Sequence, residues 1–351
     1  MKKIISLFML FSIAFALFSG CGARNAAERQ PGQELAPEQP KLRIVATIFP
    51  EYDWVRAIIG EREDIELTLL LQGGTDLHSY QPSVDDILKI SNCDMFIYTG
   101  GESSAWVFDA LKNVKNDNLV VINLLEVLGD AVVAEEIIEG MEHDHDHEED
   151  HDHDHKDGEE HDHENHDENE HSTTPDEHIW LSLRNAKTLC GHLSQALSEL
   201  DSENAEFYAA NAADYIAKLS ALDEKYMQVV SDAKCSTLLF ADRFPFRYLV
   251  EDYSLSYFAA FAGCSAETEA SFETVIFLAG RLDELSLSHI MIIDNSGSAL
   301  AATVSQSSHG KNQDILSLSS MQAVSAADIS AGTTYLSIME DNLIVLETAL
   351  N

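Results

Sequence analysis

One stretch of this chain cannot take part in a hydrophobic core. Residues 143–170 contain only His, Asp, Glu, Asn, Lys and Gly, without a single aliphatic side chain. Such a segment buries too little apolar surface to offset the entropy of ordering it. We therefore predict a disordered insertion over residues 141–171, so the fold must be built from the two flanking stretches.

The flanking stretches alternate between strand and helix patterns. Residues 42–49 and 65–71 are β-branched and apolar runs typical of buried parallel strands, and residues 84–91 show helical periodicity. The same alternation returns from residue 236 onward, and residues 202–230 between the two parts indicate one long helix. The sequence thus predicts an α/β protein: two α/β lobes with central, mostly parallel sheets, joined by a long rigid helix, with a cleft between the lobes.

The beginning of the sequence predicts export. Residues 1–20 have a positive end and an apolar run too short to span a bilayer comfortably, as a signal peptide does. Cys21 follows a small pair, which resembles a bacterial lipobox and implies lipidation of Cys21. Residues 21–41 are rich in Ala, Glu, Gln and Pro and predict a flexible, lipid-anchored tether. We therefore expect an extracytoplasmic protein that contacts the membrane through its lipid anchor only.

The same composition changes predict three folded parts. We place an N-terminal lobe at residues 42–183, linking helices at 184–232 and a C-terminal lobe at 233–351.

Charge and cysteine spacing restrict the ligands. A formal net charge of -40 argues against a nucleic-acid partner, since phosphate binding needs a basic face, and suits a cation better. Cys93, Cys190, Cys235 and Cys264 show no CxxC spacing, so a structural zinc site built from cysteines is not expected. Cys235 and Cys264 flank a strand-rich stretch, and a disulfide between them is a hypothesis for an exported chain.

Histidines fall into three groups. One group alternates with carboxylates in or beside the acidic tract, a composition that binds divalent transition metals. Its members are His143, His145, His147, His151, His153, His155, His161, His163, His166 and His171. His78 lies in GGTDLHSYQPS, in a loop after a predicted strand, where open α/β sheets bind ligands. His178 lies in PDEHIWLS, just before a predicted helix.

These motifs together resemble the zinc and manganese substrate-binding lipoproteins of ABC importers. The resemblance covers about residues 42–350 and rests on features in this order: GTDLHSYQPS followed by the predicted strand DMFIYTGG, then the His-rich insertion, then DEHIWLS. It implies two α/β lobes joined by a rigid helix, with His78 and His178 as the metal ligands of the first lobe. It also implies transported Zn²⁺ and, as partners, the permease and ATPase of a metal importer. We expect a monomer.

The second lobe departs from the pattern of this family. Arg243 and Ser319 occupy the positions of the expected second-lobe ligands, and a guanidinium offers no lone pair to a metal. We expect Asp242 and Asp294 to serve instead, with His309 as a further candidate. Three protein ligands and a water would suffice for zinc.

Other functions stay open at this point. Manganese or iron would prefer more oxygen donors, and the His-rich insertion favours zinc over both. A metal-binding adhesin or a zinc buffer without an importer is a second alternative. An enzyme is not expected, because Glu177 beside His178 lacks the HExxH spacing and no GxSxG motif is present.

Overall fold

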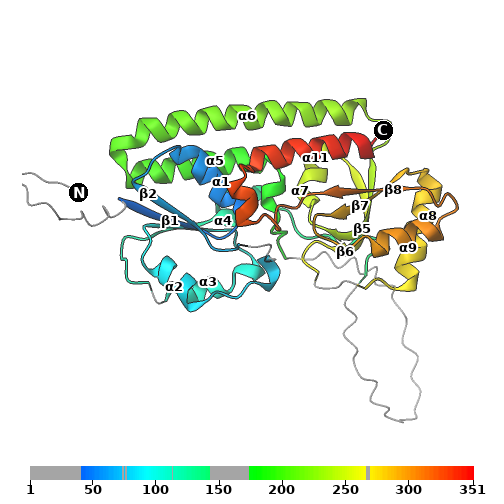
Figure 1. The fold of residues 1–351 in the computed structure, drawn as a ribbon, viewed down its shortest axis with the longest axis horizontal. Coiled ribbons are helices and arrows are strands. Elements are labelled where there is room, and N and C mark those ends of the chain that lie inside the picture. Colours follow the sequence, from blue (N-terminus) through cyan, green and yellow to red (C-terminus); the bar gives the residue numbers. More distant parts are fainter. Residues whose placement is uncertain (1–40, 73–74, 76, 113, 143–173, 266–268) are drawn as a thin grey trace, which may run out of the picture. The chain divides into compact units, whose positions relative to one another are not determined.

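Two four-stranded parallel sheets form the framework of the computed structural model (Figure 1). It describes residues 41–72, 75, 77–112, 114–142, 174–265 and 269–351. The first sheet has the order β2-β1-β3-β4 and the second the order β6-β5-β7-β8. The strands are β1 (Leu42–Ala46), β2 (Ile65–Leu69), β3 (Met95–Tyr98), β4 (Val120–Asn123), β5 (Thr237–Phe244), β6 (Ser256–Ala262), β7 (His289–Ile293) and β8 (Asp314–Leu318).

The two sheets share one topology. In each sheet, the second strand along the chain lies at an edge. The order in which strands are added reverses between the two central strands. Loops that leave the carboxyl ends of strands at such a point are the usual ligand sites of open α/β sheets. All strand pairs are parallel, which confirms the predicted fold class of two α/β halves.

Helices flank both sheets. Their bounds are α1 (Phe49–Ile59), α2 (Val84–Ser91), α3 (Trp106–Leu111), α4 (Leu124–Leu128), α5 (Leu183–Leu200), α6 (Ala205–Asp232), α7 (Arg247–Tyr253), α8 (Phe272–Leu285), α9 (Ala299–Ser307), α10 (Ala326–Ser330) and α11 (Tyr335–Ala349). The 28-residue α6 is the predicted long helix, and it contacts α1 and α5 as well as α7 and α11. Figure 1 shows it passing over both sheets.

The turn between α5 and α6 is held by one buried carboxylate. Asp201 ends α5, and its Oδ2 accepts hydrogen bonds from Asn204 Nδ2 and from the hydroxyl of Tyr208, both 2.8 Å away. At the other end of α5, the Ser182 hydroxyl caps the helix by accepting from the backbone N–H of Asn185. Both ends of the first linking helix are therefore fixed by side chains.

The two halves share their packing. The described residues from 41 onward belong to one compact unit, and one hydrophobic cluster runs from the first sheet through α5 and α6 to the second sheet. A second cluster packs α8 and α9 against β5, β6 and β7. The backbone N–H of Tyr335, at the start of α11, donates to Asp53 of α1 over 2.7 Å. Met141 is 4% exposed within this core, so ordered packing continues to the edge of the His-rich tract. The predicted domain boundaries stay a prediction.

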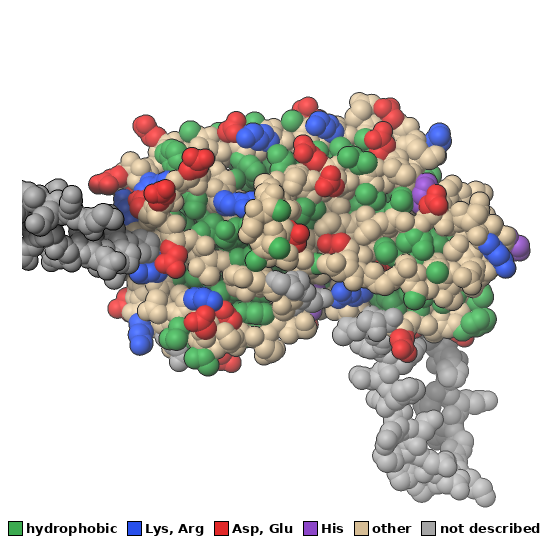
Figure 2. Space-filling model, viewed as in Figure 1, with side chains coloured by type: hydrophobic (Ala, Val, Ile, Leu, Met, Phe, Trp, Pro, Cys, Tyr) green, Lys and Arg blue, Asp and Glu red, His purple; other side chains and the backbone are tan. Residues whose placement is uncertain are grey.

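Charged side chains are mixed over the face in Figure 2, where Asp and Glu lie beside Lys and Arg. Histidine atoms are scarce there, in keeping with the complete burial of His178. Within the described residues, no helix is long and apolar enough to cross a membrane.

Candidate metal centre

The two histidines singled out by the sequence lie side by side, although 100 residues separate them. His78 lies in a short 3₁₀ turn, Leu77–Ser79, that follows β2. His178 directly precedes a second 3₁₀ turn, Ile179–Leu181. Their Nε2 atoms are 3.3 Å apart. His178 is fully buried and His78 keeps a side-chain exposure of 16%. One imidazole of the pair is therefore enclosed by protein, and the other is partly accessible to solvent.

The distance between these nitrogens suits a shared metal ion. Two nitrogens bound to one tetrahedral zinc at about 2.0–2.1 Å lie about 3.3–3.4 Å apart. The observed 3.3 Å has this length. A hydrogen bond between neutral imidazoles has a similar length, so the orientation of the rings decides what the pair can do.

A buried carboxylate sets the orientation of the His178 ring. Asp176 Oδ1 accepts from the backbone N–H of His178 at 2.8 Å and from its Nδ1 at 3.0 Å. A proton on Nδ1 leaves the lone pair on Nε2, which is the arrangement found in ligating histidines. Glu177 Oε2 lies 3.8 Å from His78 Nδ1 and accepts from the hydroxyl of Ser103, whose backbone N–H donates to Glu177 Oε1. Burial raises the pKa of Glu177.

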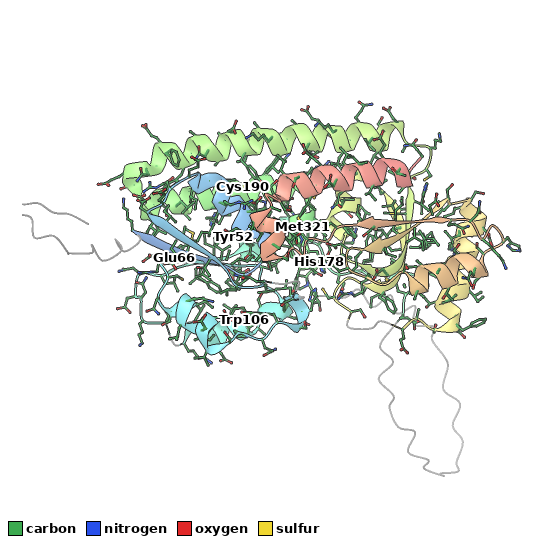
Figure 3. All side chains as sticks on the ribbon, viewed as in Figure 1. Tyr52, Glu66, Trp106, His178, Cys190 and Met321 are labelled. Carbon is green, nitrogen blue, oxygen red and sulfur yellow. The ribbon has the colours of Figure 1, made fainter. Side chains whose placement is uncertain are left out.

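The segment that carries His178 is fixed from the second half. Trp180 Nε1 donates to the carbonyl of Ser320 at 2.9 Å, and the hydroxyl of Tyr335 donates to the carbonyl of Trp180 at 2.7 Å. The hydroxyl of Tyr248 donates to the carbonyl of Asp176 at 2.8 Å. Figure 3 shows His178 and Met321 between the two halves. The imidazole is thus positioned before any ligand arrives.

A third donor comes from the second half. The Sγ of Cys264 and the ring nitrogens of His78 and His178 offer one atom each, and these three atoms lie within 4.8 Å of one another. Cys264 follows β6, the edge strand that corresponds to β2, after which His78 lies. Its backbone N–H donates to Glu135 Oε1 at 2.9 Å. Burial and then the negative charge of Glu135 raise the pKa of the Cys264 thiol.

The hypothesis of a disulfide between Cys235 and Cys264 fails in the structure, where both thiols are free. Cys235 lies just before β5, whereas Cys264 lies just after β6. Because the two strands are parallel, these positions are at opposite ends of the sheet.

The predicted carboxylate ligands do not join this cluster. Asp242 accepts from the backbone N–H groups of Arg243 and Ile293, and so ties β5 to β7 beyond their paired residues. Asp294 accepts from the hydroxyl of Ser319 and from the backbone N–H and hydroxyl of Ser320. Their oxygens stabilise the loops of the second half.

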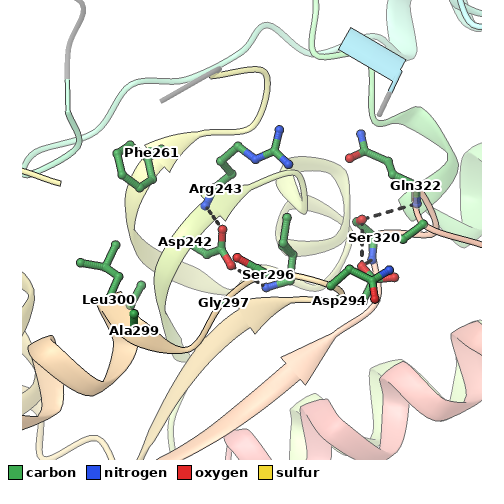
Figure 4. A pocket seen from close by; sticks show the side chains of 14 residues that line it. Asp242, Arg243, Phe261, Asp294, Ser296, Gly297, Ala299, Leu300, Ser320 and Gln322 are labelled. Atoms are coloured by element: carbon green, nitrogen blue, oxygen red, sulfur yellow. Dashed lines mark hydrogen bonds between the residues drawn. The ribbon is translucent and has the colours of Figure 1, made fainter. Parts of the chain in front are cut away.

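Both carboxylates line a cavity of about 470 Å³ at the carboxyl ends of β5 and β7 (Figure 4). Arg243, Phe261 and Gln322 contribute to the same wall. Gln322 also lines a second, much smaller hollow together with Leu77, the neighbour of His78. The cavity therefore lies in the second half, where the resemblance placed the missing ligands.

The remaining candidates lie elsewhere. His309 has a side-chain exposure of 96% and is paired with Asp283 at 2.7 Å. The ten histidines of the acidic tract and Cys21 fall outside the described residues. The role of Asp176 in orienting His178 was not predicted, although its place two residues before His178 in DEHIW was a signal for it.

Two parallel α/β halves and a cluster of side chains that could hold a metal ion define the class of this protein. The profile of the family described as "Zinc-uptake complex component A periplasmic" matches residues 44–349. The chain belongs to that family.

Curated relatives agree with this assignment. The chain is 29% identical over 346 residues to the zinc-binding protein AdcA of Streptococcus pyogenes, covering 97% of this chain and 60% of the relative. It is 27% identical to the high-affinity zinc uptake system protein ZnuA of Bacillus subtilis, over 99% of this chain and 98% of the relative. The chain thus spans about 60% of the length of the streptococcal protein and nearly all of the Bacillus one.

Solved structures show the same fold. The Zn(II)-bound ZnuA-like domain of Streptococcus pneumoniae AdcA matches with a TM-score of 0.65 and 26% identity, over 88% of this chain and 99% of that domain. The lipoprotein YcdH of Bacillus subtilis matches with a TM-score of 0.68 and 23% identity, over 88% of this chain and 99% of the other. At 23% identity, the likeness to YcdH shows a shared fold alone.

Proposed function

We propose that this protein is an extracytoplasmic receptor that captures Zn²⁺ and delivers it to an ABC-type importer. The 3.3 Å between the Nε2 atoms of His78 and His178 carries the proposal, because it is the length expected for two nitrogens on one tetrahedral zinc ion. Membership of the zinc-uptake family supports it, as does the fold shared with a Zn(II)-bound domain.

The donors favour zinc over manganese or iron. The cluster offers two imidazole nitrogens and one sulfur, whereas Mn²⁺ prefers carboxylate, carbonyl and water oxygens. The predicted oxygen donors of the second half, Asp242 and Asp294, are engaged with backbone N–H groups and hydroxyls of their own half.

Delivery and anchoring complete the proposal. The partners are the permease and ATPase of the importer, and lipidated Cys21 holds the receptor at the membrane through the tether of residues 21–41. A Cys21→Ser variant should be released from the membrane fraction, and its retention there would remove the lipid anchor from the account.

The rival functions have less support. A protein of the same fold is named as the laminin-binding adhesin of Streptococcus agalactiae, at 21% identity, and that likeness concerns the fold alone. No feature of the described residues specifically favours an adhesin. A hydrolase would need a base near a metal-bound water. The carboxylate of Glu177 instead accepts hydrogen bonds from Ser103, and it lies near Nδ1 of His78 rather than near the proposed ligand atom Nε2.

Calorimetric zinc titration tests the receptor site. The acidic tract would bind zinc by itself, so residues 143–170 are deleted while Met141, a core residue, is retained. One tight site should survive this deletion and disappear when His78→Ala and His178→Ala are added. A matched control replaces His192 and His309, which are both exposed, by Ala and should keep the site.

Two results would contradict the proposal. Loss of tight binding on deletion of the tract alone would make the protein a zinc collector on a receptor-like scaffold. Survival of tight binding in the double histidine variant would place the site elsewhere. Uptake of radioactive zinc by cells that lack the chromosomal gene, complemented with each variant, tests delivery separately.

A further inference from the structure

The second half must supply a ligand if the metal is to bridge the two halves, and its expected positions cannot do so. Arg243 carries a permanently protonated guanidinium. Ser319 donates its hydroxyl hydrogen to Asp294 at 2.8 Å. Within the described residues, Cys264 is the second-half side chain that joins the ligand cluster of the two histidines.

The backbone beside Cys264 is built for close approach to His178. A Cβ atom placed on Gly263 would lie 3.1 Å from Cε1 of His178 and 2.8 Å from the carbonyl oxygen of Phe244. Only glycine fits at this distance without displacement of backbone. The backbone at Gly263 therefore lies against the imidazole of His178, and the side chain of the next residue, Cys264, reaches the ligand cluster.

The surrounding charges make this cluster suited to a cation. Asp176 contacts His178, Glu177 lies beside His78, and Glu135 accepts from the backbone N–H of Cys264. The negative charges of these carboxylates stabilise a dication bound at the cluster.

We propose that Cys264 is the metal ligand of the second half, so that His78, His178 and the thiolate sulfur hold the ion with a fourth position left for water. This inference rests on the proposed zinc-receptor function and names the chemistry of its site. On binding, the S–H bond breaks, the sulfur lone pair forms the bond to the metal, and the proton passes to solvent. The site then selects metals that accept sulfur, such as Zn²⁺, Co²⁺ and Cd²⁺, over Mn²⁺.

A purely structural role for Cys264 is the alternative. A buried thiol often serves as a small apolar side chain, and a hydrogen bond between the imidazoles would then explain the histidine pair. Metal spectroscopy separates the two interpretations, because a packed thiol never bonds to the ion.

Cobalt substitution of the full-length chain is the test. Co²⁺ bound by a thiolate shows a near-ultraviolet sulfur-to-cobalt charge-transfer band, and the acidic tract contains no cysteine that could produce one. We expect the band in the wild-type protein and in Cys235→Ser, the matched control with a free thiol outside the cluster. It should be absent in Cys264→Ser, whose zinc affinity should fall about 100-fold or more, beyond the loss typical of outer partners.

A second variant guards against misfolding. Cys264→His should restore tight zinc binding without the charge-transfer band, which a destabilised protein would not do. A wild-type protein that binds zinc through His78 and His178 but shows no charge-transfer band would overturn the role of Cys264 and leave the receptor function intact. Zinc binding that is indifferent to both histidines would overturn the proposed function itself.

Discussion

The charge of Asp176 should contribute measurably to zinc affinity without touching the ion. Its Oδ1 accepts from both the backbone N–H and the Nδ1 of His178 within the core, at 2.8 and 3.0 Å. Asp176→Asn keeps an oxygen at that place and removes the charge, which lowers the basicity of the imidazole. Asp176→Ala removes the acceptor as well and frees the ring to rotate or to change tautomer.

The expected losses follow from the role of such outer partners. Removing a carboxylate that orients a ligating histidine costs about 10–100-fold in metal affinity, or about 1.4–2.8 kcal/mol. We expect Asp176→Asn near the lower end and Asp176→Ala near the upper end. The hydrogen bond from Tyr248 goes to the backbone carbonyl of residue 176, so both variants retain it.

The assay is a competition titration against a zinc chelator, on chains that lack residues 143–170. Asp283→Asn is the matched control, because Asp283 pairs in the same way with His309, an exposed histidine outside the cluster. It should leave the affinity unchanged. Equal affinity in the wild type and both Asp176 variants would refute the reasoning that His178 ligates through Nε2 with its tautomer set by Asp176.

Three further predictions concern pH and packing. Burial raises the pKa of Glu51 from 4.5 to about 7, so the stability that its protonated form confers is lost as pH rises from about 4.5 to about 7. Glu51→Gln should abolish this loss of up to about 3 kcal/mol, as pH-dependent denaturant unfolding would reveal; an unchanged pH profile would be contrary to the prediction. A Cβ on Gly101, at a φ of +77°, would lie 2.2 Å from Glu177 Oε1, so Gly101→Ala should weaken zinc binding and cost about 1–3 kcal/mol of stability. Gly129→Ala, also at positive φ but with open space around it, should cost stability and leave zinc affinity unchanged in the same titration. Zinc affinity of the wild-type site should fall as pH drops through about 6.5, where free imidazole gains its proton, and a flat affinity from pH 7.5 to 5.5 would exclude imidazole ligands.

Local pattern was enough to predict most of the regular elements. The helix at residues 84–91 has the bounds that its periodicity indicated, and the long helix expected over 202–230 is Ala205–Asp232. The C-terminal helix α11 was not predicted. Its side chains pack against α6 and also α1, so it lacks the single apolar face that marks an ordinary surface helix.

The sequence predicted the residues that the first half contributes to the cluster, but not the residue of the second half. His78 and His178 stand in motifs whose order along the chain resembles a known family, and the structure brings them together. Cys264 comes to the same place because β6 is an edge strand and Gly263 lets the backbone pass over an imidazole. Neither relation is local in sequence, so the expected positions, occupied by Arg243 and Ser319, pointed to neighbouring carboxylates instead.

Anomalous scattering at the zinc edge, from crystals of the protein grown with Zn²⁺, tests the central claim most directly. We predict a strong peak about 2.0–2.1 Å from the Nε2 atoms of His78 and His178 and about 2.3 Å from the Sγ of Cys264. A fully loaded crystal with no peak between these atoms, and with zinc bound instead at Asp242 and Asp294, would contradict it.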